Sequence, residues 1–340
     1  MTRRLSSITI HDVARQAGVS VATVSRYING NAPVSTEVAE RLNRVMKELR
    51  YVPLAAARHL ATRKTRVIGL LVSDLHNDFF VPLLNGIETV VREKEYNLIV
   101  ATYHVNSRNT MPPPIGPHNT DGLLVFSDGL VDEDLAHLNA SAFPMVLLYR
   151  TSPTSLNIPS VTAENKEIAH KLVEHLIQVH GKRRILFFCG PIHQEDANLR
   201  EEGYRSALAA NGIPLREDLI LRGEFDRDIA YQVLNDFLDH EKRVAFDAAF
   251  TGDDDSAIGV LQALHEHEYR IPEDVAVVGF DDLSFARFLD PPLTTVRAPT
   301  ETVGRIAAEK LFAILENRSS NEAVVLPTEI ILRRSCGCNA

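Results

Sequence analysis

The 340-residue sequence predicts a small all-α domain with a helix-turn-helix, followed by a larger two-lobed α/β domain built on parallel sheets. Three observations lead to this prediction. Helix start and stop signals are closely spaced in residues 1–53, strand-like and helical segments alternate from residue 66 onward, and the two parts carry opposite charge. We therefore expect a helix-turn-helix domain at 1–53, a linker at 54–65 and a two-lobed domain at 66–340.

The charge is distributed unevenly along the chain. Residues 1–66 hold twelve Lys or Arg against four Asp or Glu, a balance of +8, whereas the rest of the chain has a balance of −17. A basic head is attracted to a polyanion while an acidic body is repelled by it. A solvated basic surface fits the charge equally well, so the helix signals must decide between the two.

Two short helices are predicted at the start of the head. Thr9 and Asp12 resemble a capping box and Gly18 supplies a stop, which predicts a helix at 10–17. Ser20 can cap a second helix at 21–28. Because only residues 18–20 separate the two helices, the spacing is that of a helix-turn-helix.

A third helix is predicted to open at Ser35, with Glu37 in its first turn. Its apolar face can cover the first two helices and give the head a small core. That face consists of Val38, Leu42, Val45, Met46 and Leu49.

The second helix of such a motif enters the major groove of DNA. Val21 and Ala22 are apolar at positions that suit contact with thymine methyl groups, and Arg26 is suited to read guanine. A plain three-helix bundle with a polar face remains an alternative. The expected DNA-contacting residues of the motif are Thr9, Ser20, Val21, Ala22, Thr23, Ser25, Arg26 and Asn29.

The run ITIHDVARQAGVSVATVSRYIN at 8–29, with VS at 34–35 and YVP at 51–53, closely resembles the lac repressor and galactose repressor (LacI/GalR) family of bacterial regulators. The resemblance implies a base-reading role for Val21, Ala22 and Arg26. The Val-Ala pair is similar to the galactose-repressor branch of that family.

The resemblance also implies a hinge helix in the alanine-rich stretch 54–62, which is too short to be stable alone in water. In the family this helix pairs with its dimer mate in the minor groove, where the residue matching Leu60 kinks the duplex. Arg58 and Leu60 are the residues of this stretch that we expect to contact DNA. A linker residue packed on the larger domain is the alternative for Leu60. Leu54 stands where the family usually has asparagine, which puts a cap or phosphate contact in doubt.

Strand-like runs in the body form two groups. Two open sheets predict a hinged binder with its ligand beyond the carboxyl ends of the strands. Over residues 66–336 the pattern resembles periplasmic sugar-binding proteins and the effector domain of the same family. The predicted strands are 67–74, 98–104, 121–128 and 145–150 in the first lobe, and 184–190, 219–225, 248–254 and 275–282 in the second.

Side chains near the strand ends suit a polyhydroxylated ligand, because carboxylates and a guanidinium bond hydroxyls and an aromatic ring covers the apolar face of a sugar. The resemblance places four of them, Arg200, Phe225, Asp253 and Asp281, in an effector pocket. Asp253 replaces the usual asparagine, which favours a ligand with an extra donor or a cationic group. A core role for the phenylalanines and a turn cap at Asp281 are the alternatives. The expected effector-binding residues are Asn77, Phe79, Phe80, Arg200, Phe225, Asp253 and Asp281.

A proline-rich segment at 111–117 interrupts the first lobe. Prolines at 112–114 and 117 exclude a regular helix where the fold calls for one that covers the sheet. The family uses that flank in its dimer contact, so the dimer geometry of this chain is in question.

An enzyme and a solute-binding protein without a DNA role are the competing classes. Two runs could suggest the metal site of an enzyme: the acids at 253–255, for magnesium, and HEHE at 265–268. Neither is convincing, because three consecutive side chains diverge on any helix or strand and HEHE is expected on a solvated helix end. No G-x-S-x-G elbow or phosphate-binding glycine loop occurs. Too few ligands are expected around Cys336 and Cys338 for zinc, so we expect no metal and no cofactor.

Three cysteines, no signal peptide and no membrane-spanning run favour a cytoplasmic protein without a membrane partner. The sequence therefore predicts a homodimeric regulator that binds near-palindromic operator DNA. It is expected to act as a repressor of carbohydrate-utilisation genes, with a small effector, a sugar or sugar derivative, modulating DNA binding.

Overall fold

A computed structural model describes residues 8–29, 32–51, 64–75, 78–103, 112–240, 244–318 and 322–339. The chain divides into two compact units, Met1–Arg66 with Asn119–Asp121, and Val67–His118 with Gly122–Ala340. We call the first unit the head and the second the body. The expected hinge helix, including Leu54, Arg58 and Leu60, lies outside the described residues, as does Asn77.

The head contains the three expected helices, α1 (Ile10–Ala17), α2 (Val21–Asn29) and α3 (Thr36–Glu48). The Asp12 carboxylate accepts hydrogen bonds from the backbone N–H and the hydroxyl of Thr9, at 3.0 and 2.8 Å, and so satisfies the start of α1. Gly18 ends that helix with a φ of 65°, a left-handed conformation that glycine adopts without strain.

Ser20 begins α2, since its Oγ accepts the Thr23 N–H at 3.1 Å. The spacing of the helix-turn-helix is therefore confirmed, with α2 one residue longer than expected. The three helices enclose a small apolar core. The buried members of that core are Val13, Ala14, Ala17, Val24, Leu42 and Val45.

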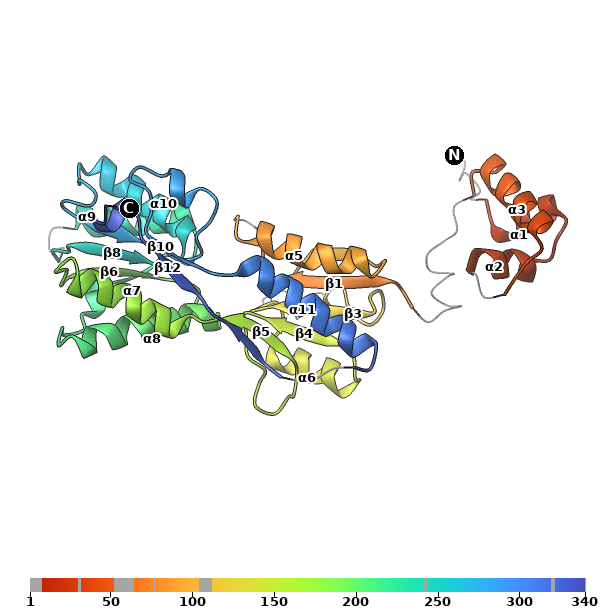
Figure 1. The fold of residues 1–340 in the computed structure, drawn as a ribbon, viewed down its shortest axis with the longest axis horizontal. Helices are drawn as coiled ribbons and strands as arrows, with labels where there is room; N and C mark the ends of the chain where they lie inside the picture. The colour runs from red at the N-terminus through yellow and green to blue at the C-terminus, as the bar shows by residue number, and fades with distance from the viewer. Residues whose placement is uncertain are drawn as a thin grey trace, which may run out of the picture. The chain divides into compact units, whose positions relative to one another are not determined.

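The first lobe of the body is built on a six-stranded parallel sheet with the order β11-β5-β4-β3-β1-β2 (Figure 1). Helices α5 (Phe80–Glu93) and α11 (Thr300–Leu315) pack on one face, and α6 (Asp132–Ala140) packs on the other. The strands are β1 (Val67–Val72), β2 (Asn97–Thr102), β3 (Gly122–Phe126), β4 (Met145–Leu148), β5 (Ser160–Ala163) and β11 (Val324–Leu326).

No helix forms at 112–121, the described part of the proline-rich segment, as the prolines predict. Ile115 from this segment is buried and packs with Leu71, Leu123 and Val125 on the α6 face of the sheet. The segment thus supplies apolar cover to the sheet without helical structure.

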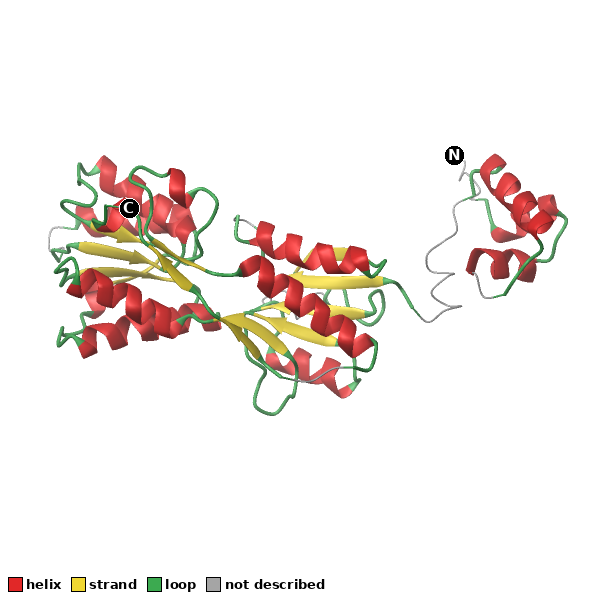
Figure 2. Cartoon of the chain, in the orientation of Figure 1, coloured by secondary structure: helices red, strands yellow, loops and turns green. Residues whose placement is uncertain are grey.

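The second lobe has a four-stranded parallel sheet with the order β7-β6-β8-β9. Helices cover both of its faces (Figure 2): α7 (Lys166–Gln178) and α8 (Glu195–Ala210) on one, α9 (Arg227–Asp239) and α10 (Asp254–Glu266) on the other. The strands are β6 (Ile185–Cys189), β7 (Ile220–Arg222), β8 (Ala248–Thr251) and β9 (Ala276–Val278).

All eight predicted strands are confirmed, and four short strands were not predicted. Two of these, β10 (Thr295–Arg297) and β12 (Glu329–Ile331), pair antiparallel. Between them the chain returns to the first lobe through α11 and β11. The other two missed strands are β5 and β11, which pair in parallel, with β11 at the edge of the first-lobe sheet.

Candidate functional site

Helix α2 presents a mixed surface. Ala22 and Arg26 are exposed, and the Arg26 Nε donates a hydrogen bond to the Ala22 carbonyl at 3.3 Å. Val21 is half-buried and packs against the core of the head, so only part of this side chain faces outward. The apolar and guanidinium groups expected to meet bases therefore share one exposed strip, to which Val21 contributes least.

The remaining DNA-contact candidates lie at the helix starts. Thr9 and Ser20 are exposed, and both side chains also take part in helix caps. The Thr23 hydroxyl lies 2.8 Å from that of Ser20, and Ser25 is half-buried. Asn29 is the last residue of α2. The caps fix the backbone of this turn, which positions the exposed strip of α2.

Six of the seven expected effector-binding residues line one cavity of about 90 Å³ between the lobes of the body. We call this cavity the inter-lobe pocket. From the first lobe it is lined by Ser73, Asp74, Phe79, Phe80 and Phe126, and from the second by Pro191, Gln194, Asp196, Arg200, Glu224, Phe225, Asp253 and Asp281.

A larger cavity of about 810 Å³ also lies between the lobes and shares Ser73 with the inter-lobe pocket. Its lining includes Arg150 from the first lobe and Glu195 and Asn198 from the second. Ligand pockets ordinarily measure about 300–1,000 Å³. The buried polar groups therefore line the inter-lobe pocket, and the larger cavity beside it has the volume that a ligand needs.

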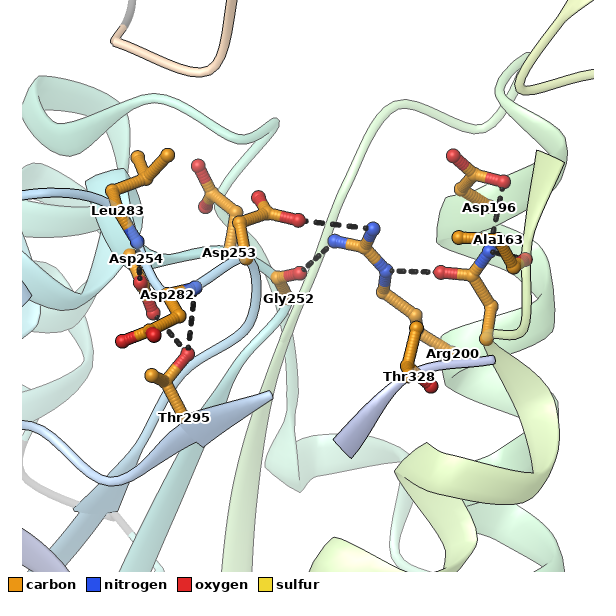
Figure 3. A network of polar contacts seen from close by, with 12 residues as sticks. Ala163, Asp196, Arg200, Gly252, Asp253, Asp254, Asp282, Leu283, Thr295 and Thr328 are labelled. Carbon is orange, nitrogen blue, oxygen red and sulfur yellow. Dashed lines mark hydrogen bonds and ion pairs between the residues drawn. The ribbon is translucent and has the colours of Figure 1, made fainter. Parts of the chain in front are cut away.

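Arg200 is the centre of a buried polar network at the ends of the strands (Figure 3). Its Nε donates to the Asn165 side-chain oxygen at 2.8 Å and its Nη1 to the Gly252 carbonyl at 2.5 Å. Its Nη2 lies 3.4 Å from the Asp281 carboxylate. Fixed in this way, the guanidinium and the carboxylate form a rigid, directional pair.

Aromatic rings flank this pair. The Arg200 guanidinium carbon lies 3.7 Å from the centre of the Phe280 ring and 5.3 Å from that of Phe225, both within cation-π range. A Cβ on Gly190 would lie 2.2 Å from the Phe225 ring and one on Gly252 would lie 2.7 Å from it. The ring of Phe225 therefore rests on two glycines that follow strands β6 and β8.

Phe79 and Phe80 combine the two roles considered for them. Phe80 is almost fully buried in the core of the first lobe, and Phe79 is half-buried at the start of α5. The Phe79 ring packs against Tyr149, Phe80 and Phe126 at centre distances of 5.3, 5.6 and 5.9 Å. Both rings line the pocket, but Phe80 is mainly a core residue.

The pocket is acidic, and its carboxyl groups are buried. Burial raises the pKa of Asp196 and of Asp253 to about 7 each. Burial also raises the pKa of Asp281, although Arg200 opposes the shift. Asp196 was not among the expected site residues. It lies four residues before Arg200 on α8, which places both side chains on one face of the helix. This spacing is the sequence signal that could have identified it.

The three consecutive acids at 253–255 serve three separate partners. Asp253 accepts the Ser256 N–H at 3.1 Å and caps α10. Asp254 accepts the Leu283 N–H at 2.8 Å and the Thr295 hydroxyl at 2.6 Å, and Asp255 accepts the Arg227 N–H at 3.1 Å. Their carboxylates point in different directions, as the sequence argument expects.

The expectation that too few metal ligands surround Cys336 and Cys338 is wrong. His175 and His180 lie beside them, and one ligand atom of each of the four residues falls within 4.8 Å of the other three. The histidines are more than 150 residues away in the sequence, so spacing alone gave no indication of this cluster.

Comparison with known proteins identifies the class. Residues 9–53 match the family described as bacterial regulatory proteins, lacI family, and residues 173–336 match a periplasmic binding protein-like domain. The chain is 30% identical to catabolite control protein A of Priestia megaterium, over 97% of this chain and 99% of that protein. It is 33% identical to a ribose operon repressor of Haemophilus influenzae, over 96% and 98% of the two chains.

The chain belongs to the lacI family. Among solved structures, the complex of the transcriptional regulator CelR with cellobiose matches at a TM-score of 0.70 and 31% identity, over 96% of this chain and 99% of that one. A lac repressor dimer bound to operator and an anti-inducer matches at a TM-score of 0.79 and 25% identity, over 97% and 99%.

Membership of the lacI family makes this chain a DNA-binding transcriptional regulator and not an enzyme. The helix-turn-helix and the two-lobed architecture expected from the sequence are confirmed, and a solute-binding protein without a DNA role is excluded. Among the described residues, no helix is both long and apolar enough to cross a membrane.

Proposed function

We propose that this lacI-family protein is a dimeric repressor of carbohydrate-utilisation genes, whose operator binding is modulated by a small sugar-like effector held between the lobes, in the inter-lobe pocket and the larger cavity beside it. The observation that carries the proposal is the buried Arg200–Asp281 pair beside the Phe225 ring, in the same chain as a helix-turn-helix. Directional hydrogen-bonding groups next to an aromatic face suit a sugar ring.

The charge of the inter-lobe pocket restricts the effector. Among the described residues that line it, Arg200 is basic and five are acidic: Asp74, Asp196, Glu224, Asp253 and Asp281. The raised pKa of Asp196 and Asp253, about 7 each, leaves these two only partly ionised at neutral pH. Acidic side chains still outnumber the one guanidinium, so we favour a neutral or cationic polyol over a sugar phosphate. Relatives named as a ribose operon repressor and a CelR–cellobiose complex support a neutral sugar.

A lobe movement couples this pocket to DNA. Effector binding shifts the equilibrium between two arrangements of the lobes by the difference in its affinity for them. In the dimer, this movement changes the affinity of the two helix-turn-helix units for a near-palindromic operator. Cytoplasmic location follows from this role, and relief of repression by the sugar is the favoured direction.

The effector is tested by a thermal-shift screen of neutral pentoses, hexoses and disaccharides, with sugar phosphates and purines as comparison groups. We expect a neutral sugar to raise the Tm of the wild type but not that of Asp281→Ala. Asp290→Ala, at an exposed position in the loop before β10, is the matched control and should keep the shift. A phosphorylated sugar as the best ligand, or a shift unchanged in Asp281→Ala, would contradict the proposal.

The DNA contact is tested with Arg26→Ala. Loss of a guanidinium that reads one base should cost about 1–3 kcal/mol of binding free energy and relax the preference at that base pair. Arg44→Ala changes an exposed arginine on α3 and should preserve sequence preference. Fluorescence anisotropy with specific and random duplexes measures the sequence preference of both variants. Equal loss on both duplexes for Arg26→Ala would remove it from the base-reading role.

A further inference from the structure

The end of α7 and the C-terminal tail bring four metal-ligand side chains together in the second lobe. His175 is in the last turn of α7, and His180 follows the helix. Cys336 ends the short 3-10 helix η4 (Arg334–Cys336), and Cys338 comes two residues later. Cys336 is buried and the other three side chains are half-buried, so the cluster lies at the edge of the core.

Four of the six distances between these atoms are close to the edges of a zinc tetrahedron, and all six are within 4.8 Å. Zn–S bonds of about 2.3 Å and Zn–N bonds of about 2.0–2.1 Å imply tetrahedral edges of about 3.4 Å between nitrogens and about 3.6 Å between nitrogen and sulfur. The two Nε2 atoms lie 3.2 Å apart. Cys338 Sγ lies 3.5 Å from Nε2 of His175 and 3.4 Å from that of His180, and Cys336 Sγ lies 3.9 Å from His175 Nε2.

The surroundings hold the tail in this position. Ser335 accepts the Thr294 N–H at 2.8 Å and donates to the Val277 carbonyl at 2.6 Å, which anchors the residue before Cys336. The Thr294 hydroxyl lies 3.1 Å from Cys336 Sγ. Partners of this kind around the ligands orient a metal site.

Gly337 separates the two cysteines and has a φ of 105°, a conformation that favours glycine. A Cβ at this position would also lie 3.1 Å from His180 Nδ1. The C-G-C spacing therefore turns both sulfurs toward the histidines without a side chain in the way.

We propose that His175, His180, Cys336 and Cys338 form a structural Zn²⁺ site that fastens the C-terminal tail to α7. The four side chains supply two sulfurs and two imidazole nitrogens, the closed ligand set of structural zinc sites. On binding, the two thiol protons pass to solvent and both sulfurs bind as thiolates, with no change of oxidation state. Within the described residues, no other group of His, Cys, Asp or Glu side chains converges in this way.

The site has a structural consequence for the pocket. Helix α7 begins directly after Asn165, which accepts the hydrogen bond from Arg200, and it ends at the proposed site. Metal binding at the far end of the helix should therefore stabilise the second lobe as a whole.

The test uses the full chain, freed of metal with a chelator and kept reduced by a phosphine. It is titrated with ZnCl₂ and, separately, with CoCl₂. We expect one equivalent of metal per chain and a rise in Tm with Zn²⁺. With Co²⁺ we expect the visible bands of tetrahedral coordination and a near-ultraviolet thiolate-to-cobalt absorption.

Variants then assign the ligands. Cys338→Ser and His180→Ala should each lose about tenfold or more in metal affinity. Cys189→Ala and His137→Ala, which change the remaining cysteine and an exposed histidine on α6 of the first lobe, should bind as the wild type does. The circular dichroism of each metal-free variant shows whether it is folded.

Three results would overturn the proposal: no binding of either metal, a cobalt spectrum without the thiolate absorption, or undiminished affinity in both ligand variants. The cobalt spectrum of the wild type decides the matter even if a variant fails to fold.

Discussion

Arg200 carries a charge in a place where water does not reach it, with an exposed fraction of 4%. A buried guanidinium is tolerated only when its donors are bonded, and here a side-chain amide, a backbone carbonyl and a carboxylate serve that purpose. The same network leaves Asp281 with a fixed partner. Arg200 thus has a structural role in addition to its proposed contact with the effector.

Replacing Arg200 with methionine should destabilise the fold strongly. The Asp281 carboxylate would remain buried without its partner, and removal of one member of a buried pair typically costs about 3–5 kcal/mol. Urea unfolding followed by circular dichroism measures the change. Arg216→Met, at the exposed Arg216–Asp218 pair, is the control and should leave the unfolding midpoint unchanged. A similar midpoint for both variants would show that the Arg200 network does not stabilise the protein.

Asp253 makes stability depend on pH. Its pKa is raised from 3.8 to about 7, first by burial and then by the nearby Asp281. Between about pH 4 and pH 7 the folded state keeps the proton that the unfolded state has lost, so the free energy of unfolding falls as the pH rises through this window.

Asp253→Asn should therefore stabilise the protein, and more at pH 8 than at pH 5. Asparagine can still accept the Ser256 N–H that caps α10 but does not ionise. The advantage over wild type should grow by up to about 1.4 kcal/mol per pH unit inside the window. Urea unfolding at pH 5, 6, 7 and 8 measures it. An advantage that is constant with pH would mean that Asp253 is not the titrating group.

At the scale of elements, the sequence predicted the parts whose patterns are local. The caps at Thr9 and Ser20 and the apolar runs of eight strands were sufficient to place those helices and strands. Strands β5, β10, β11 and β12 have three or four residues each, as β4, β7, β8 and β9 also do. The four missed strands lie next to proline or charged residues and not within the longer strand-like runs that predicted the others.

The pocket residues that were predicted are those that match the family pattern or follow a predicted strand, such as Arg200, Phe225 and Asp281. The histidines of the proposed zinc site were missed for a physical reason: tertiary contacts bring them to the cysteines over more than 150 residues, a separation that no local spacing encodes. Asp196 was missed although its spacing of four residues from Arg200 on α8 is local. Val21 was expected to face bases, and the packing of the head core turns part of it inward.

Helices α5 and α11 approach each other through glycines. A Cβ on Gly86 would lie 2.0 Å from the Glu301 carbonyl, and one on Gly304 would lie 2.4 Å from the Leu83 carbonyl. Backbone atoms of the partner helix cannot yield as the end of a flexible side chain can. The contact between the helices therefore depends on the absence of a side chain at both positions.

Gly86→Ala should force α5 away from α11 and lower stability by about 1–3 kcal/mol or more. Because α5 begins at the pocket residue Phe80, the variant should also bind the effector more weakly. Gly116→Ala is the matched control, since the nearest atoms to its added methyl lie 3.7 Å away. Thermal unfolding and the sugar-induced shift in Tm measure both effects. If Gly86→Ala matched this control, the helix contact would not be as tight as the structure indicates.

At the scale of the whole molecule, charge separates the two functions. Residues 1–66, with a balance of +8, carry the exposed Arg26, and residues 67–340, with a balance of −17, carry the effector pocket. An acidic body repels DNA, so the body should add nothing to non-specific binding. Binding should therefore be confined to the head and weaken steeply with salt, since each phosphate contact adds about −0.9 to the slope of log K against log salt.

Deletion of residues 1–62 should abolish DNA binding even at low salt and leave the sugar-induced rise in Tm intact. The two lobes have their own cores and a pocket that the head does not line, which is why ligand binding should survive. Anisotropy with operator and random duplexes at low and moderate salt, beside the thermal-shift assay, measures both activities on the same sample. Residual operator binding by the truncated chain would place a DNA contact in the acidic body. Loss of the sugar response would instead mean that the pocket depends on the head, and that binding and regulation are less separable than the charge distribution indicates.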